Sequence, residues 1–113
     1  MRAVVTDEAG IILVDKVLQG GSSNIAELWA VTEALLFAKS CKITDLDLYT
    51  DSRITIGWLK GHVGKKLNDR AAVMNLLTTI NNLRTKIGMN ATWVPREQNV
   101  AGVFIERNPH EAL

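Results

Sequence analysis

The chain opens with two short apolar runs that are separated by a polar turn. Arg2–Thr6 and Ile11–Leu18 are rich in β-branched and aliphatic residues, and Asp7–Gly10 lies between them. A polar segment that ends in glycine between two such runs is typical of a β-hairpin. The pattern therefore predicts two antiparallel strands at the start of the chain.

The next segment changes to a helical period. Apolar positions recur there every three or four residues, at Ile25, Leu28, Trp29, Thr32, Leu35 and Leu36. This spacing predicts a helix with one buried face. Ser23 or Asn24 can cap its start, Glu27 falls in its first turn, and it should end near Ser40 or Cys41.

The remaining pattern predicts further strands and helices in alternation. Asp45–Thr50 reads as a strand, and a short helix should run from Ser52 to Lys60. A longer helix should follow from residue 68 or 69 to about 87, then a strand at 90–94 and a final helix at about 99–107. The predicted order is β-β-α-β-α-α-β-α, which indicates a single α/β domain over residues 1–113 with a mixed sheet.

Composition changes this picture little. The chain has 113 residues, 47% of them hydrophobic and 22% charged, with a net charge of +1. Any basic surface for nucleic acid must therefore come from local clustering, since the overall charge is nearly balanced. A lone cysteine, Cys41, excludes an internal disulfide, and no apolar run is long enough to span a membrane. We expect a cytoplasmic protein without a membrane contact.

Two acidic residues hold the positions where catalytic chemistry is most often placed in such folds. Glu27 lies near the start of the first helix, and Asp51 follows the strand Asp45–Thr50. Ligands of α/β sheets gather at the carboxyl ends of strands, so the two carboxylates can converge there and share a cation. Each residue also has an ordinary explanation, as a favourable charge near a helix start or as a helix cap.

Four segments together resemble the ribonuclease H family. The turn Asp7–Gly10 resembles the turn between the family's second and third strands, and Ser22–Leu35 resembles its first helix. Leu48–Ser52 resembles its fourth strand, and Trp93–Asn99 resembles its last strand and the loop that follows. The four segments occur in the family's order and cover nearly the whole chain.

The resemblance implies a three-layer fold, with a mixed sheet and helices on both of its faces. It also implies hydrolysis of the RNA strand of RNA/DNA hybrids by two Mg²⁺ or Mn²⁺ ions. Glu27 and Asp51 would be catalytic metal ligands. Hybrids are recognised by shape and by 2′-hydroxyl groups, which small polar groups can contact. The candidates for this contact are Ser22, Ser23, Asn24 and Ser52.

Basic residues supply further candidates for substrate binding. Many ribonucleases H hold the DNA strand with a basic protrusion, and the corresponding segment here carries Lys60, His62, Lys65 and Lys66. A solvated loop is the alternative interpretation of this cluster. Arg96 precedes the predicted final helix, in a loop that the family often places beside the metal ions.

Two positions depart from the family pattern. The family's first strand carries an essential aspartate, and this chain is expected to begin at the second strand, which would leave a gap in the sheet. The second and fourth strands could pair directly, or a homodimer could complete the sheet. A competing alignment makes Val4–Asp7 the first strand, with Asp7 as the catalytic residue. The family's last aspartate aligns with the region of Gly102, and Glu106 is its candidate replacement.

These departures leave alternatives to the leading interpretation of a nuclease. One is a catalytically impaired module of the same fold that binds nucleic acid. The other is an assembly domain whose exposed sheet edge mediates oligomerisation.

Overall fold

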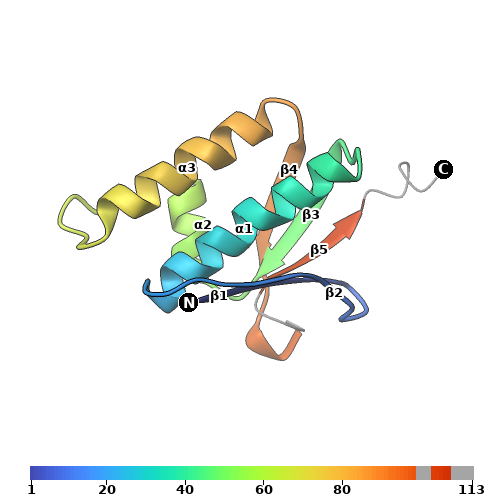
Figure 1. The fold of residues 1–113 in the computed structure, drawn as a ribbon, viewed down its shortest axis with the longest axis horizontal. Coiled ribbons are helices and arrows are strands. Elements are labelled where there is room, and N and C mark those ends of the chain that lie inside the picture. The colour runs from blue at the N-terminus through green and yellow to red at the C-terminus, as the bar shows by residue number, and fades with distance from the viewer. Residues whose placement is uncertain (99–102, 108–113) are drawn as a thin grey trace.

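The computed structural model describes residues 1–98 and 103–107. In chain order it contains β1 (Arg2–Asp7), β2 (Ile12–Val17), α1 (Ser23–Ser40), β3 (Asp45–Thr50), α2 (Arg53–Leu59), α3 (Arg70–Arg84), β4 (Gly88–Trp93), the 3-10 turn η1 (Arg96–Gln98) and β5 (Val103–Arg107). Figure 1 shows the helices packed over a twisted sheet. No helix in these described residues is both long and apolar enough to cross a membrane.

The predicted hairpin forms from β1 and β2, which pair in antiparallel orientation. Its turn is held by Asp7, whose Oδ1 accepts the backbone N–H groups of Ala9 and Ile11 at 2.9 Å each. Gly10 has a positive φ of 86°, which glycine adopts without steric cost. The hairpin was therefore predicted correctly, and its turn uses the Asp7 carboxylate for structure.

The long helix α1 supplies much of the core. Its N-cap is Ser22, one residue earlier than predicted, and the Ser22 hydroxyl accepts the N–H of Ile25 at 3.2 Å. Leu28, Val31 and Leu35 are fully buried. Because the helix begins at Ser23, Glu27 is its fifth residue and lies just beyond the first turn.

The sheet has five strands in the order β2-β1-β5-β3-β4. β5 lies in the centre, parallel to β1 and antiparallel to β3, with Val5, Val103 and Thr50 side by side. The prediction of a helix at 99–107 was therefore wrong for residues 103–107, and residues 99–102 lie outside the described part. The expected gap in the sheet is filled by this chain itself, so the sheet does not need a second copy.

Residues 103–107 form a strand because buried and more exposed side chains alternate along β5. Val103 and Ile105 are buried to 1% exposure on one side of the strand, whereas Glu106 is exposed. On the opposite side Phe104 stacks on Tyr49 of β3, with ring centroids 4.8 Å apart. A strand between β1 and β3 satisfies backbone N–H and C=O groups that would otherwise be unpaired. Period-two burial and this pairing outweigh the helical pattern that the sequence suggested.

The core lies between one face of the sheet and the helices. α1 contacts β1, β2 and β5, α2 contacts β3 and β4, and α1 also contacts both other helices. The buried residues form one cluster that includes Leu48, Trp58 and Ile80. The described helices thus cover a single face of the sheet, where the sequence predicted helices on both. The layer on the other face was an implication of the family resemblance, and residues 103–107, predicted as part of a final helix, form β5 within the sheet.

Smaller differences concern element ends. The strand Asp45–Thr50 has the predicted bounds. α3 ends at Arg84, short of the predicted 87, and Gly88 begins β4 instead of only stopping the helix. These shifts leave the order of the first seven elements as predicted.

Candidate functional site

Glu27 lies on the face of α1 that points to the carboxyl end of β3. Its Oε2 accepts a hydrogen bond from the Thr50 hydroxyl at 3.4 Å, which joins the helix to the last residue of the strand. The same Thr50 oxygen accepts the backbone N–H of Ser52 at 3.1 Å. Thr50 is completely buried and Glu27 is half-buried, so this link is partly shielded from water. The carboxylate of Glu27 is therefore held in place over the strand end.

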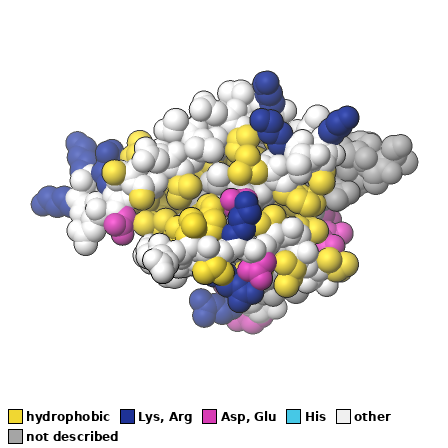
Figure 2. All heavy atoms as spheres, viewed as in Figure 1, with side chains coloured by type: hydrophobic (Ala, Val, Ile, Leu, Met, Phe, Trp, Pro, Cys, Tyr) yellow, Lys and Arg dark blue, Asp and Glu magenta, His cyan; other side chains and the backbone are white. Residues whose placement is uncertain are grey.

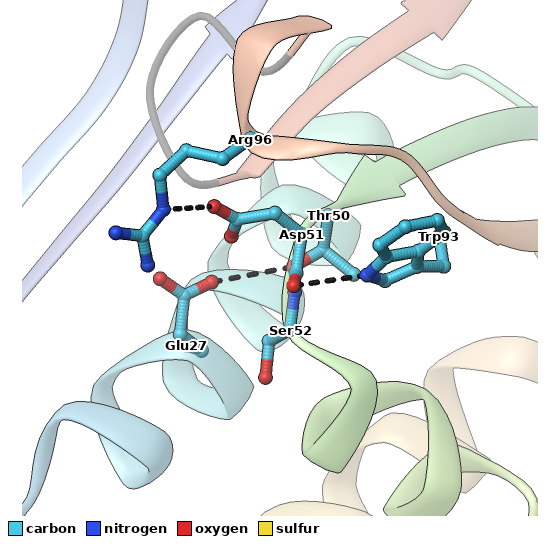
Figure 3. Close-up of polar contacts among 6 residues, drawn as sticks. All are labelled: Glu27, Thr50, Asp51, Ser52, Trp93 and Arg96. Carbon is cyan, nitrogen blue, oxygen red and sulfur yellow. Dashed lines mark hydrogen bonds and ion pairs between the residues drawn. The ribbon is translucent and has the colours of Figure 1, made fainter.

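Asp51 follows directly after β3, where the chain turns into α2. The Ser52 hydroxyl caps that helix by accepting the N–H of Thr55 at 3.1 Å. The cap fixes the turn, and the Asp51 side chain projects from it toward the start of α1, as Figure 3 shows. Its side chain is 18% exposed, so the carboxylate is mostly enclosed but open on one side.

The loop after β4 closes the site. The backbone N–H of Val94 donates to the Thr50 carbonyl at 2.9 Å, and the Trp93 indole N–H donates to the Asp51 carbonyl at 3.0 Å. These bonds fix the start of the loop beside the end of β3. Two residues later, Arg96 Nε donates to Asp51 Oδ2 at 3.3 Å, which forms an ion pair.

An open cleft of about 440 Å³ surrounds these groups. Its walls come from the start of α1, the start of α2 and the loop after β4. The lining side chains include both carboxylates, two arginines and one indole: Ser23, Asn24, Glu27, Asp51, Ser52, Arg53, Ile54, Trp93 and Arg96. The cleft therefore combines an acidic centre with basic and aromatic walls.

The electrostatics of Glu27 reflect this enclosure. Burial raises the pKa of the Glu27 carboxyl above its usual value, and the nearby Asp51 carboxylate raises it further. The hydrogen bond from Thr50 and the positive charge of Arg96 act in the opposite direction. Two carboxylates in one enclosed site repel each other, and a cation beside both relieves that repulsion.

The oxygen donors of the pair suit a hard divalent ion. Mg²⁺ binds through one or two protein carboxylates and keeps several water molecules, and the open side of the cleft gives room for them. Within the described residues no group of three or more His, Cys, Asp or Glu side chains is placed to hold a metal ion. The residues described here therefore fit one hydrated ion better than a carboxylate-rich centre for two.

Several residues chosen from the sequence do meet at this cleft. Glu27, Asp51 and Arg96 lie together, and Ser23, Asn24 and Ser52 line the same cleft. Ser22 and Ser52 both use their hydroxyl oxygens as helix caps. The Ser52 oxygen also accepts the Thr55 hydroxyl at 2.9 Å.

Asp7 does not join the pair. β1 and β5 are parallel, and Asp7 is aligned with Ile105, which in turn lies beside Leu48 in the middle of β3. Asp51 follows the end of β3, beyond Thr50. The Asp7 carboxylate is occupied by the hairpin turn, so the structure does not place it as the catalytic aspartate of the competing alignment.

Glu106 is also distant from the pair along the sheet. β5 is antiparallel to β3, and this direction places Glu106 beside Asp47 and Val103 beside Thr50. The Tyr49 hydroxyl donates to Glu106 Oε2 at 3.1 Å. The hypothesis that Glu106 replaces the last aspartate depended on a helix, and the strand carries the side chain away from the cleft.

The basic cluster lies at the other end of α2. Lys60 is the C-cap of α2, and His62, Lys65 and Lys66 follow in the loop before α3. Figure 2 shows basic side chains gathered at the end of the molecule that carries this loop. Lys60 also lines a groove of about 360 Å³ between α2 and α3, together with Trp58 and Arg70. These residues form a surface separate from the cleft.

Three residues of the site were not among the candidates from the sequence. Thr50 connects the two acidic residues, and a hydroxyl residue directly before the strand-end acid was the available signal. Trp93 is 37% exposed in the cleft, and the Arg53 guanidinium lies 4.2 Å from its ring centroid. The position of Trp93 directly before the Val94–Gln98 loop was the signal for this stacked pair.

Comparison with known proteins agrees with this architecture. A family model described as reverse transcriptase-like matches residues 1–103. Among solved structures, the chain is similar to the N-terminal RNase H domain of rv2228c from Mycobacterium tuberculosis, determined as a fusion with maltose binding protein. The TM-score is 0.64 with 21% identity over 79% of this chain, so the likeness shows the fold alone. The match spans 64% of that structure's chain, and no curated protein is significantly similar.

Proposed function

Since the chain belongs to the reverse transcriptase-like family and has an RNase H-like fold, we propose that it hydrolyses the RNA strand of RNA/DNA hybrids with a divalent metal ion. The observation that supports this most is the convergence of two carboxylates, Glu27 and Asp51, in one cleft at the carboxyl end of β3. This is the position where open α/β sheets bind their ligands.

The chain's own residues would hold the ion and orient it. Glu27 and Asp51 would be its protein ligands, and Mg²⁺ or Mn²⁺ would activate a water molecule and neutralise charge on the phosphodiester. The Thr50 hydroxyl fixes the Glu27 carboxylate by its hydrogen bond, and the Ser52 cap fixes the turn that carries Asp51. Both hydrogen bonds are formed without a ligand, so less conformational entropy is lost when a ligand binds.

The cleft walls suit a nucleic-acid duplex. Ser23 and Asn24 lie beside the acidic pair, and polar groups in this place can contact 2′-hydroxyls of an RNA strand. Arg53 and Arg96 flank the pair with groups that bind phosphate. A hybrid that lies across the cleft would then bring an RNA phosphate to the carboxylates.

One observation favours a second function, hybrid binding without cleavage. Asp51 is already paired with Arg96, and among the described residues no third acidic side chain joins the pair. A site with fewer carboxylates binds metal less tightly and neutralises less transition-state charge. The same cleft would then bind hybrid as a module whose chemistry is impaired.

The test is a hybrid assay that separates binding from cleavage. A 5′-labelled RNA annealed to DNA is incubated with the protein in Mg²⁺, in Mn²⁺ and in EDTA, with duplex DNA of the same sequence as the control. Metal-dependent shortening of the RNA with intact duplex DNA supports the nuclease. Binding of hybrid with no shortening in either metal supports the second function, and absence of both binding and cleavage would exclude the two proposals.

A further inference from the structure

The guanidinium of Arg96 occupies the side of the acidic pair that is open to solvent. Figure 3 shows it extending from the loop after β4 toward the space between the Glu27 and Asp51 carboxylates. Its Nε contacts Asp51 Oδ2 at 3.3 Å, and Arg96 lines the same cleft as both carboxylates. Among the described residues, Arg96 is thus the cationic side chain that forms an ion pair with an acid of this cleft.

Hydrogen bonds at the start of the loop after β4 position the backbone of Arg96 at the cleft. Trp93 and Val94 each donate a hydrogen bond to the end of β3, so the loop starts from a fixed point. Pro95 follows, and the turn η1 begins at Arg96. The chain therefore presents the arginine at the cleft without needing a ligand to order it.

The contact itself is weak enough to be exchanged. The Arg96 side chain is 91% exposed, whereas Asp51 is 18% exposed. In contrast, the pair between Arg2 and Asp15 on the sheet edge is bidentate, with contacts of 2.8 and 2.7 Å. A single long contact from a solvated guanidinium is easily given up, since exposed pairs contribute little free energy.

We propose that Arg96 is an internal counter-ion that a divalent metal ion must displace from Asp51. This inference rests on the proposed metal site and adds a means by which metal occupancy is regulated. When the metal binds, the arginine loses its carboxylate partner while its backbone stays at the cleft. The freed guanidinium then lies beside the acidic pair, where a phosphate of the nucleic acid can replace Asp51 as its partner.

The test measures metal affinity directly, in the absence of nucleic acid. Free Mn²⁺ is followed by electron paramagnetic resonance during titration of the wild type, Arg96→Gln and Arg96→Lys, with circular dichroism to check folding. Loss of the competing pair should make Mn²⁺ binding about two- to fivefold tighter in Arg96→Gln. Arg96→Lys should fall between the two, because it keeps the charge without the guanidinium geometry. Asp51→Asn should abolish the binding.

Arg53→Gln is the matched control. It removes the same charge from the same cleft, but the Arg53 guanidinium stacks on Trp93 and is not the arginine paired with Asp51. A smaller increase in Mn²⁺ affinity in Arg53→Gln than in Arg96→Gln supports the proposal. Equal gains in both, no gain in Arg96→Gln, or no Mn²⁺ binding in any variant would overturn it. The hybrid assay above decides the proposed function separately, since it measures cleavage with substrate present.

Discussion

At the scale of single residues, the site combines the negative charges of Glu27 and Asp51 with two arginines, of which Arg96 pairs with Asp51 and Arg53 stacks on Trp93. Glu27 is more enclosed than an ordinary surface acid, and Asp51 and Arg96 act on it in opposite directions. Both acidic residues were identified from the sequence, because their segments resemble a known family. Arg96 was predicted only as a substrate contact, since one-dimensional spacing does not reveal an ion pair across 45 residues. Asp7 was misplaced because its role depended on strand order, and Glu106 because its role depended on a helix where β5 forms instead.

The enclosure of Glu27 predicts a pH-dependent cost to stability. Because folding raises the pKa of its carboxyl, the ionised form destabilises the folded state at pH above the unfolded-state pKa of about 4.3. Glu27→Gln keeps an oxygen that can accept from Thr50 and removes the charge. In EDTA, the substitution should raise the free energy of unfolding at pH 7 by roughly a few tenths of a kcal/mol, after solvent screening.

The gain from Glu27→Gln should shrink as the pH falls below the unfolded-state pKa of about 4.3, because the wild-type carboxyl becomes protonated in both states. Urea denaturation at pH 7 and pH 4 measures it. Glu8→Gln, at an exposed position in the hairpin turn, is the control for loss of one negative charge. An equal effect of Glu27→Gln at both pH values would show that the enclosed charge is not its cause.

At the scale of elements, β5 is the strand that the sequence did not predict. The hairpin, α1, β3 and the two following helices were predicted from periodicity, because each has a clear period and a turn or cap signal. Residues 103–107 are too few to separate period two from a helical period. Residues 103–107 form a strand because they pair with β1 and β3, and both of these strands lie far from β5 in the chain. The local pattern of apolar and polar residues does not report such long-range strand pairing.

The central place of β5 predicts a large effect of a small substitution there. Ile105 is 1% exposed and lies between β1 and β3, so Ile105→Ala should destabilise the fold by about 2–5 kcal/mol. Chemical denaturation gives the value. Glu106→Ala, the next residue on the exposed side, should change it by less than about 1 kcal/mol. Equal small effects at both positions would contradict a buried central β5.

At the scale of the whole molecule, α2 connects the acidic cleft to the basic loop. Arg53 at its start lines the cleft, and Lys60 at its end begins the loop that carries Lys65 and Lys66. A helix of this length separates the two surfaces by about 10 Å along its axis. A duplex of the proposed substrate would contact both, which would let a chain with a net charge of only +1 bind it.

This arrangement predicts that the loop adds salt-dependent contacts. The double substitution of Lys65 and Lys66 by Gln should reduce the slope of log K against log salt by up to about 1.8, if each lysine neutralises one phosphate. Fluorescence anisotropy with a labelled hybrid at several salt concentrations measures the slope. Lys39→Gln together with Lys86→Gln, which line a separate pocket beside α3, removes the same charge elsewhere. An equal reduction in that control would assign the effect to overall charge.

We propose above all that Glu27 and Asp51 form the reactive site of this RNase H-like domain. The most direct measurement is the rate of RNA cleavage in a hybrid by wild type and Asp51→Asn, at the same saturating Mn²⁺ concentration. Asn is isosteric with Asp and keeps the turn into α2, so folding should be retained. We expect cleavage by the wild type and a loss of roughly 100-fold or more in Asp51→Asn. Cleavage at an unchanged rate in Asp51→Asn would contradict it.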